Sequence, residues 1–258
     1  MIVAARMTGK SKTFVKNMLC RLALMGLRMK PIGSWPPWIQ RIGEIKVPSG
    51  TVPRDPATTG GAEIGVVLSL LEESRDLGGD VAECGVYRAS TLIPTGVWLQ
   101  QQGLEKILFG FDSFEGFDES VAIDVALGGA EEVERKVGGL GQTSLPYVDA
   151  KVRRFGLSRT IRLVPGFFEK TLSTVADRKF CFVHLDVDLY ESYKTCLEFF
   201  YPRVVSGGII LLDEYDDPSW PGCNKAVDEF LADRPEDCRR IERKGYVKFY
   251  IQKQAAGD

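Results

Sequence analysis

The chain has 258 residues, 44% of them hydrophobic and 26% charged, which is typical of a soluble globular protein built around one large domain. A chain of this length buries a full core without disulfides or structural metals. Its net charge of −2 argues against a strongly basic nucleic-acid-binding protein, so we expect no nucleic acid partner.

The cysteine pattern and the hydropathy of the chain predict its cellular compartment. The six cysteines form no CxxC pair and match no zinc-binding spacing, which favours reduced thiols in the cytoplasm. No stretch approaches the roughly 20 apolar residues that a membrane-spanning helix needs. We therefore expect a cytoplasmic protein without a transmembrane segment.

The first 60 residues differ in composition from the rest. Residues 1–30 carry seven basic side chains and no acidic ones, which leaves the remainder of the chain with a net charge of about −9. Basic residues interrupt the apolar run at 14–27, which predicts an amphipathic helix rather than a signal peptide. We expect it to pack on the domain or on a second subunit, with weak membrane-surface contact as the alternative. Residues 31–60 are rich in Pro, Gly and Thr and predict an irregular arm, so 1–60 is separated from a main domain over 61–258.

From residue 61 onward, strand and helix patterns alternate. In chain order the sequence predicts a helix over 62–76, a strand over 80–86, a helix over 90–102, strands over 106–112, 160–164 and 180–186, a helix over 191–201, a strand over 208–213, a helix over 223–233 and two strands around Gly245 in 238–251. Nearly continuous apolar strands that alternate with helices form parallel sheets covered on both faces. We therefore predict an α/β, Rossmann-like fold with a seven-stranded, mostly parallel sheet, one antiparallel strand and helices on both faces.

Residues 118–150 break this rhythm. They are rich in glycine and acidic residues, among them Gly128, Gly129, Glu131 and Glu132. Long segments of this kind often cover an active site. We predict an insertion over the active site, a candidate lid.

The segment Glu83–Ser90 follows the first predicted strand directly. In open α/β sheets, ligands bind beyond the carboxyl ends of the strands, and a glycine such as Gly85 lets the backbone approach a ligand closely. The N-terminus of the next helix adds free N–H groups. Ala89 stands where a dinucleotide-type motif would often have a second glycine, so a plain strand–helix turn remains an alternative.

A second polar segment, Phe111–Phe117, follows the next predicted strand. Asp112 ends that strand, 29 residues after Glu83, where a carboxylate accepts hydrogen bonds from two ribose hydroxyls. The alternative is an acidic residue that caps a strand end. Together with the first segment, this spacing predicts a nucleoside site.

The third segment is the most informative. A buried strand ends in Asp186-Val187-Asp188, and the next strand ends in Asp213-Glu214. Neighbouring parallel strands bring such acidic side chains together, and clustered carboxylates raise one another's pKa unless a cation neutralises them. Carboxylate oxygens suit Mg²⁺, so we favour a metal site over solvated loop acids.

These segments together predict a metal and a nucleoside cofactor at one edge of the sheet. A divalent cation would bind a substrate hydroxyl and lower its pKa, and Asp188 would take the proton as general base. His184 is the only histidine, which excludes a His-rich metal site, and we interpret it as a packed core side chain. Phe167 and Phe168 either flank an adenine ring or pack in the core.

The chain resembles the macrocin O-methyltransferase family, whose better-known members methylate sugars on macrolides and aminocoumarins. Five segments in the expected order carry the resemblance: VAECGVYRAST (81–91), FGFDSFEGF (109–117), GFFEKTL (166–172), HLDVDLYESYKTCLEFFYPRVVSGGIILLDEY (184–215) and NKAVDEF (224–230). The long fourth segment is the specific one.

The resemblance implies a class I methyltransferase fold, S-adenosylmethionine as cofactor, Mg²⁺ or another divalent cation, and usually a homo-oligomer. Carried over to matching positions, it implies the metal ligands Asp186, Asp213 and Glu214, with Asp188 as catalytic base. The family commonly has two aspartates where this chain has Asp213-Glu214, and the longer glutamate still offers carboxylate oxygens. We assign cofactor binding to Glu83, Gly85, Tyr87, Ser90, Asp112, Ser113, Phe168 and Asp186.

The expected activity is metal-dependent O-methyl transfer from S-adenosylmethionine to a hydroxyl of a sugar or glycosylated natural product. One alternative is a glycosyltransferase, since a DxD motif after an apolar strand also binds a metal with a nucleotide sugar. The position of Asp112 and the second acidic pair argue against it. Another is a non-catalytic member that binds the nucleoside cofactor, which loss of the metal carboxylates would favour; they are present here.

Overall fold

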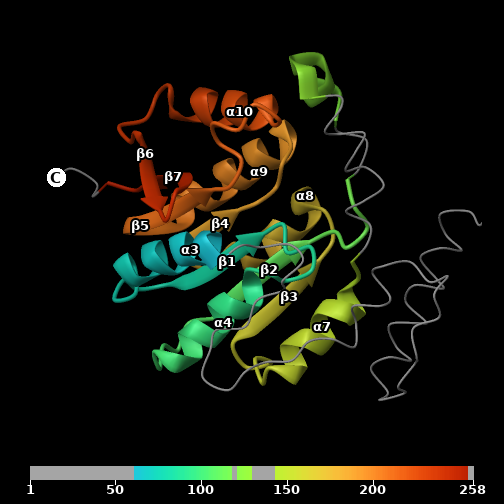
Figure 1. Cartoon of the computed structure of the whole chain (residues 1–258), viewed down its shortest axis with the longest axis vertical. Coiled ribbons are helices and arrows are strands. Elements are labelled where there is room, and N and C mark those ends of the chain that lie inside the picture. Colours follow the sequence, from blue (N-terminus) through green and yellow to red (C-terminus); the bar gives the residue numbers. More distant parts are fainter. Residues whose placement is uncertain (1–60, 118–120, 130–142, 255–258) are drawn as a thin grey trace, which may run out of the picture.

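The fold is a single seven-stranded sheet with helices on both faces (Figure 1). The computed structural model describes residues 61–117, 121–129 and 143–254. The predictions for 1–60, and for the parts of the candidate lid at 118–120 and 130–142, lie outside the described residues.

The sheet has the strand order β3-β2-β1-β4-β5-β7-β6. Its strands are β1 (Asp80–Cys84), β2 (Leu108–Asp112), β3 (Ile161–Pro165), β4 (Phe180–Leu185), β5 (Val204–Leu212), β6 (Cys238–Arg243) and β7 (Tyr246–Gln252). β1 to β5 pair in parallel, whereas β7 runs antiparallel to both β5 and β6. The predicted mostly parallel sheet with one antiparallel strand is therefore confirmed.

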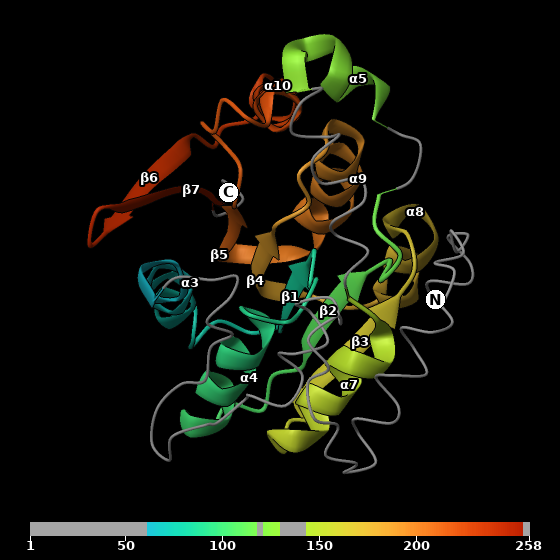
Figure 2. The same cartoon turned by 45° about the vertical axis from the view of Figure 1, so that its right-hand side comes forward.

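Helices cover the two faces of the sheet in two sets (Figures 1 and 2). One set is α3 (Gly61–Glu73), α4 (Leu92–Gln101) and α7 (Leu145–Arg154), and the other is α8 (Phe168–Thr171), α9 (Tyr190–Phe200) and α10 (Pro221–Leu231). Each set packs on its own apolar core, the first around Leu70 and Leu99, the second around Phe200 and Val227. The four helices predicted from periodicity are α3, α4, α9 and α10.

β4 is the central strand of the sheet, and its apolar sequence suits a position without a solvent-facing side. All six residues of FCFVHL are buried, and β1 and β5 flank it. Burying a large apolar side chain such as Phe180 or Phe182 contributes about 1.5–3 kcal/mol. This buried strand ends at Leu185, so Asp186 and Asp188 follow from a well-packed position at the edge of the sheet.

Short elements surround this frame. The 3₁₀ turns η4 (Leu172–Val175) and η5 (Tyr201–Arg203) follow α8 and α9, and α5 (Ala122–Asp124) with η2 (Val125–Gly129) lies near α10 (Figure 2). Asp124 is buried there, and its carboxylate accepts the backbone N–H of Tyr190, the first residue of α9 (Oδ1, 3.1 Å). This part of the predicted insertion thus caps a core helix.

α7 was not predicted from the sequence, which assigned residues 145–150 to the candidate lid. Ser144 caps the N-terminus of the helix, and its side chain accepts the N–H of Tyr147. Val148 and Val152 are buried on one face together with Tyr147 and Lys151, and the last turn has three basic residues. An apolar stripe this short gives only a weak helical periodicity.

The structure also bears on the expectations of reduced cysteines and of a chain without a membrane-spanning helix. The five cysteines among them are free, and Cys84, Cys181, Cys196 and Cys223 are buried. In the described part of the chain, no helix combines the length and the apolar character that a membrane span requires.

Candidate active site

A cavity of about 710 Å³ lies at the carboxyl ends of the parallel strands. The segments after β1 to β5 line it, together with Tyr246 and Lys248 of β7. Every residue assigned from the sequence to the cofactor, the metal or catalysis lines this cavity: Glu83, Gly85, Tyr87, Ser90, Asp112, Ser113, Phe168, Asp186, Asp188, Asp213 and Glu214. The structure brings these residues together, and their chemical roles stay predictions.

The loop after β1 is held by its neighbours on both sides. The N–H of Gly85 donates to the carbonyl of Phe111 on β2, and the N–H of Asp186 donates to the carbonyl of Cys84 (both 2.9 Å). These bonds continue the parallel ladder beyond the strands. They place Gly85 between the segment that contains Asp112 and the segment that contains Asp186.

Asp112 is oriented by backbone donors. Its Oδ2 accepts the N–H of Tyr87 at 2.7 Å, and its Oδ1 accepts the N–H of Phe114 at 2.6 Å. The Ser113 hydroxyl donates to the carbonyl of Gly116 in the same turn. The Asp112 carboxylate therefore has a fixed direction at the end of β2, where the sequence predicted a ribose contact.

α7 supports the loop that contains Tyr87 and Arg88. Lys151 donates to the Arg88 carbonyl at 2.6 Å, the Arg88 guanidinium donates to the Tyr147 hydroxyl, and the Thr143 hydroxyl donates to the Tyr87 carbonyl. These partners are 56 to 63 residues apart in the chain. No local signal in the sequence predicts such contacts.

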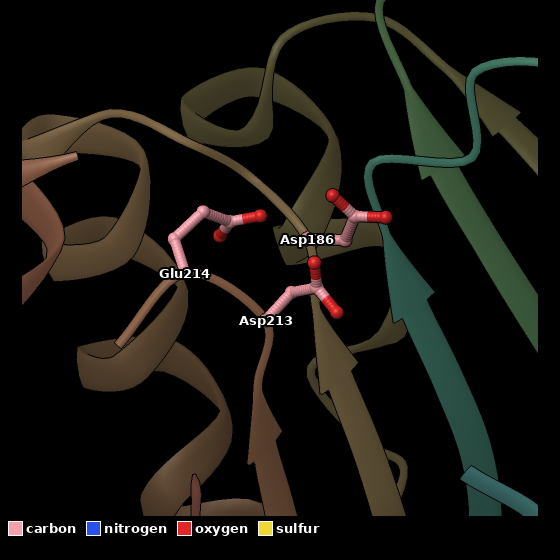
Figure 3. Close-up of side chains that lie close together, drawn as sticks. All are labelled: Asp186, Asp213 and Glu214. Carbon is pink, nitrogen blue, oxygen red and sulfur yellow. The ribbon is translucent and has the colours of Figure 1, made fainter. Parts of the chain in front are cut away.

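Three carboxylates converge beyond β4 and β5 (Figure 3). Leu185 pairs with Leu212 in the parallel register, so Asp186 and Asp213 follow at the same edge of the sheet. Asp186, Asp213 and Glu214 each offer a carboxylate oxygen within 4.8 Å of the other two. The convergence expected from the two acidic strand ends is therefore present.

The electrostatics of this cluster are uneven. Burial, followed by the charge of Asp213, raises the pKa of both Asp186 and Glu214. Burial also acts to raise the pKa of Asp213, but the hydrogen bond to His184 and the charge of Lys248 outweigh it and lower that pKa. Asp213 is thus the ionised member, while the other two carboxyl groups favour a proton or a cation.

His184 is buried, as its position in β4 predicted, but it is more than a packing residue. It is 1% exposed, its Nε2 lies 3.4 Å from Asp213 Oδ1, and its Nδ1 lies 4.0 Å from Glu83 Oε2. Burial lowers the pKa of His184, but the two carboxylates outweigh this and raise it to about 10. His184 therefore favours its protonated form and lies between the side chains of Glu83 on β1 and Asp213 after β5.

Two side chains that hold the acidic cluster were not predicted from the sequence. The Tyr193 hydroxyl on α9 donates to Glu214 Oε2 at 2.5 Å and accepts the backbone N–H groups of Asp213 and Glu214. Lys248 on β7 forms an ion pair with Asp213 Oδ1 at 2.7 Å. Tyr193 lies in the predicted helix over 191–201 and in the segment 184–215 that carries the family resemblance, and Lys248 lies in a predicted strand, but the sequence predicted no role at the site for either side chain.

Comparison with known proteins gives a family and a fold. The family model described as macrocin-O-methyltransferase (TylF) matches residues 68–246. An enzyme of Streptomyces olivaceus, named 8-demethyl-8-(2,3-dimethoxy-alpha-L-rhamnosyl)-tetracenomycin-C 4'-O-methyltransferase, is 32% identical over 59% of this chain and 58% of its own. Demethyldecarbamoylnovobiocin O-methyltransferase of Streptomyces niveus is 29% identical over 65% of this chain and 64% of its own. The chain thus matches about three fifths of the length of these relatives.

Among solved structures, the O-methyltransferase NovP superimposes with a TM-score of 0.68 at 23% identity, over 94% of this chain and 99% of NovP. This likeness shows that the fold is that of class I O-methyltransferases. Neither the family match nor the fold supports the alternative of a DxD glycosyltransferase. The chain therefore belongs to the macrocin O-methyltransferase (TylF) family.

Proposed function

We propose that this chain is an S-adenosylmethionine-dependent O-methyltransferase that uses a divalent metal and methylates a hydroxyl of a glycosylated small molecule. The observation that carries the proposal is one cavity that contains both Gly85 and Asp112 and the acidic cluster of Asp186, Asp213 and Glu214. The family and fold support methyl transfer as the reaction class.

Cofactor binding is proposed for the edge formed by β1 and β2. Two neighbouring ribose hydroxyls would donate to the fixed carboxylate of Asp112, and Gly85 would let the cofactor approach the backbone. Glu83, Tyr87, Ser90 and Ser113 line the same cavity. Phe168 would offer an apolar surface to the adenine ring.

The residues present fit a divalent cation. Asp186, Asp213 and Glu214 are hard oxygen donors, and each offers an oxygen within 4.8 Å of the other two. Burial and mutual repulsion raise the pKa of Asp186 and Glu214, and a positive charge between them relieves both effects. These three residues would hold the ion, which when bound lowers the pKa of an acceptor hydroxyl.

Asp188 is the proposed proton acceptor. Its side chain lines the cavity, and its backbone adopts φ +60°, a strained conformation of the kind that clusters at functional sites. Its N–H donates to Glu214 Oε2 at 3.4 Å, which connects the base to the acidic cluster. S-adenosylmethionine supplies the electrophilic methyl group. The chain orients the acceptor oxygen, takes its proton on the Asp188 carboxylate and limits the access of water.

The acceptor class rests on the relatives. One is named for a rhamnosyl-tetracenomycin substrate and the other for demethyldecarbamoylnovobiocin. We propose a glycoside of this natural-product kind, and Phe117, Trp220 and Tyr246 provide aromatic surface in the cavity for it. Magnesium as the metal, a homo-oligomer and a cytoplasmic location stay predictions.

Calorimetry with S-adenosylhomocysteine tests the cofactor site. We expect wild-type protein to bind, Asp112→Ala to bind far more weakly, and the matched surface variant Asp76→Ala to bind like wild type, since the Asp76 side chain is 93% exposed. Mass spectrometry of glycosides incubated with S-adenosylmethionine then detects one added methylene, with and without a chelator. Absence of cofactor binding at millimolar concentration contradicts the proposal.

A further inference from the structure

Lys248 is a buried cation within an acidic cavity. Among the described residues that line the cavity, it has the one Lys or Arg side chain, whereas nine have carboxyl groups. Its ammonium group lies 2.7 Å from Asp213 Oδ1 and also donates to the backbone carbonyl of Asp213. The two side chains are 11% and 16% exposed, so water screens this pair weakly.

The sheet topology places this lysine opposite the acidic cluster. β7 pairs antiparallel with β5, with Leu211 opposite Tyr250 and Leu212 opposite Phe249. The same register, continued by one residue, puts Lys248 opposite Asp213. The antiparallel strand β7 therefore places the Lys248 ammonium at the edge of the sheet where the carboxylates that follow β4 and β5 lie.

Asp213 takes part in two arrangements at once. Its Oδ1 contacts both Lys248 and, at 3.4 Å, His184 Nε2, while an oxygen of the same carboxylate belongs to the cluster with Asp186 and Glu214. A divalent ion that uses Asp213 would lie close to the Lys248 ammonium. In a poorly screened site, repulsion between two such cations exceeds the contribution of one hydrogen bond that orients a ligand.

We infer that Lys248 is an internal counter-cation, which holds Asp213 in place without a metal and weakens the affinity of the acidic cluster for divalent cations. This inference rests on the metal-binding part of the proposed function. The change in metal affinity on removing the Lys248 charge separates this role from a purely structural one. If Lys248 only supported Asp213, its loss would loosen Asp213 and weaken metal binding. If Lys248 competes with the metal as a second cation, its loss strengthens metal binding.

The test is titration of the full chain with Mn²⁺ alone, followed by electron paramagnetic resonance of the free ion. Lys248→Met removes the charge and keeps an unbranched side chain, and Lys248→Arg is the matched control that keeps the charge. We expect Lys248→Met to bind Mn²⁺ at least about tenfold more tightly than wild type, and Lys248→Arg to stay close to wild type, because electrostatic repulsion dominates.

Lys248→Gln provides a second neutral variant, which decides the question if Lys248→Met does not fold. Binding by the folded neutral variant that is equal to wild type, weaker or undetectable overturns the inference. S-adenosylhomocysteine calorimetry on the same samples separates this result from failure of the proposed function. If wild type does not bind that ligand, the proposed function fails, while the Mn²⁺ comparison still decides the role of Lys248.

Discussion

Gly85 and Asp186 are in such close contact that no side chain fits between them: a Cβ on Gly85 would lie 1.6 Å from the Asp186 carbonyl oxygen. Gly85 also has φ +90°, a conformation that residues with a side chain rarely adopt. The tip of β1 therefore approaches the acidic segment only because this residue is glycine. The contact joins the proposed cofactor loop to the proposed metal site.

Gly85→Ala should damage both cofactor binding and stability. The new methyl group forces the loop after β1 away from Asp186, because the obstacle is backbone and cannot rotate aside. We expect a loss of S-adenosylhomocysteine binding by calorimetry and a lower melting temperature. Gly78→Ala is the control, since nothing lies within 4 Å of a Cβ at that position. Equal behaviour of the two variants would contradict this account of the β1 tip.

Tyr193→Phe should loosen the acidic cluster. The change removes the donor to the buried Glu214 carboxyl group and the acceptor of the backbone N–H groups of Asp213 and Glu214, and we expect a cost of about 1–3 kcal/mol in the free energy of unfolding. Mn²⁺ affinity should fall about tenfold or more, as it does when a group that orients a ligand is lost. Tyr190→Phe, whose hydroxyl donates to Glu229 outside the cluster, is the matched control. Unchanged Mn²⁺ affinity in Tyr193→Phe would show that Glu214 does not depend on this hydroxyl.

Asp188→Asn should separate catalysis from binding. The amide keeps the shape of the side chain but does not take a proton, so methyl transfer should fall by about 10²–10⁴-fold. S-adenosylhomocysteine affinity should remain at the wild-type value, because Asp188 is proposed to contact the acceptor. Turnover rates and calorimetry on the same preparation provide the comparison. Persistent turnover would mean that another group accepts the proton.

Ala89→Gly should stabilise the protein. Ala89 has φ +61°, and a left-handed conformation costs a residue with a Cβ about 1–2 kcal/mol. Glycine avoids most of that cost but loses more entropy on folding and gives up the buried methyl group of Ala89, so we expect a net gain of less than about 1 kcal/mol. Ala226→Gly in the middle of α10 is the opposite control and should destabilise by at least about 0.5–1 kcal/mol, because it weakens the helix and also removes a buried methyl group. Thermal unfolding measures both, and a lower melting temperature for Ala89→Gly would contradict the strain.

The position of the proposed functional residues at one edge of the sheet could be predicted, because these residues follow the ends of the strands. Asp112, Asp186 and Asp213 each mark the end of an apolar run, and parallel strands place all such ends at one edge of a sheet. The packing of α7 beneath the Tyr87–Arg88 loop could not be predicted in this way. Its apolar stripe is short, and its partners are dozens of residues away.

The amino-acid sequence by itself therefore determined the fold class, the family and the line of acidic strand tips, because periodicity and local motifs are properties of short segments. Only the tertiary structure decided that Lys248 faces Asp213 and that Tyr193 holds Glu214. The first contact depends on the antiparallel register of β7, and the second on the way α9 packs under the edge of the sheet. Both are consequences of how distant elements fit together, and such fits are not encoded in the spacing of residues along one segment.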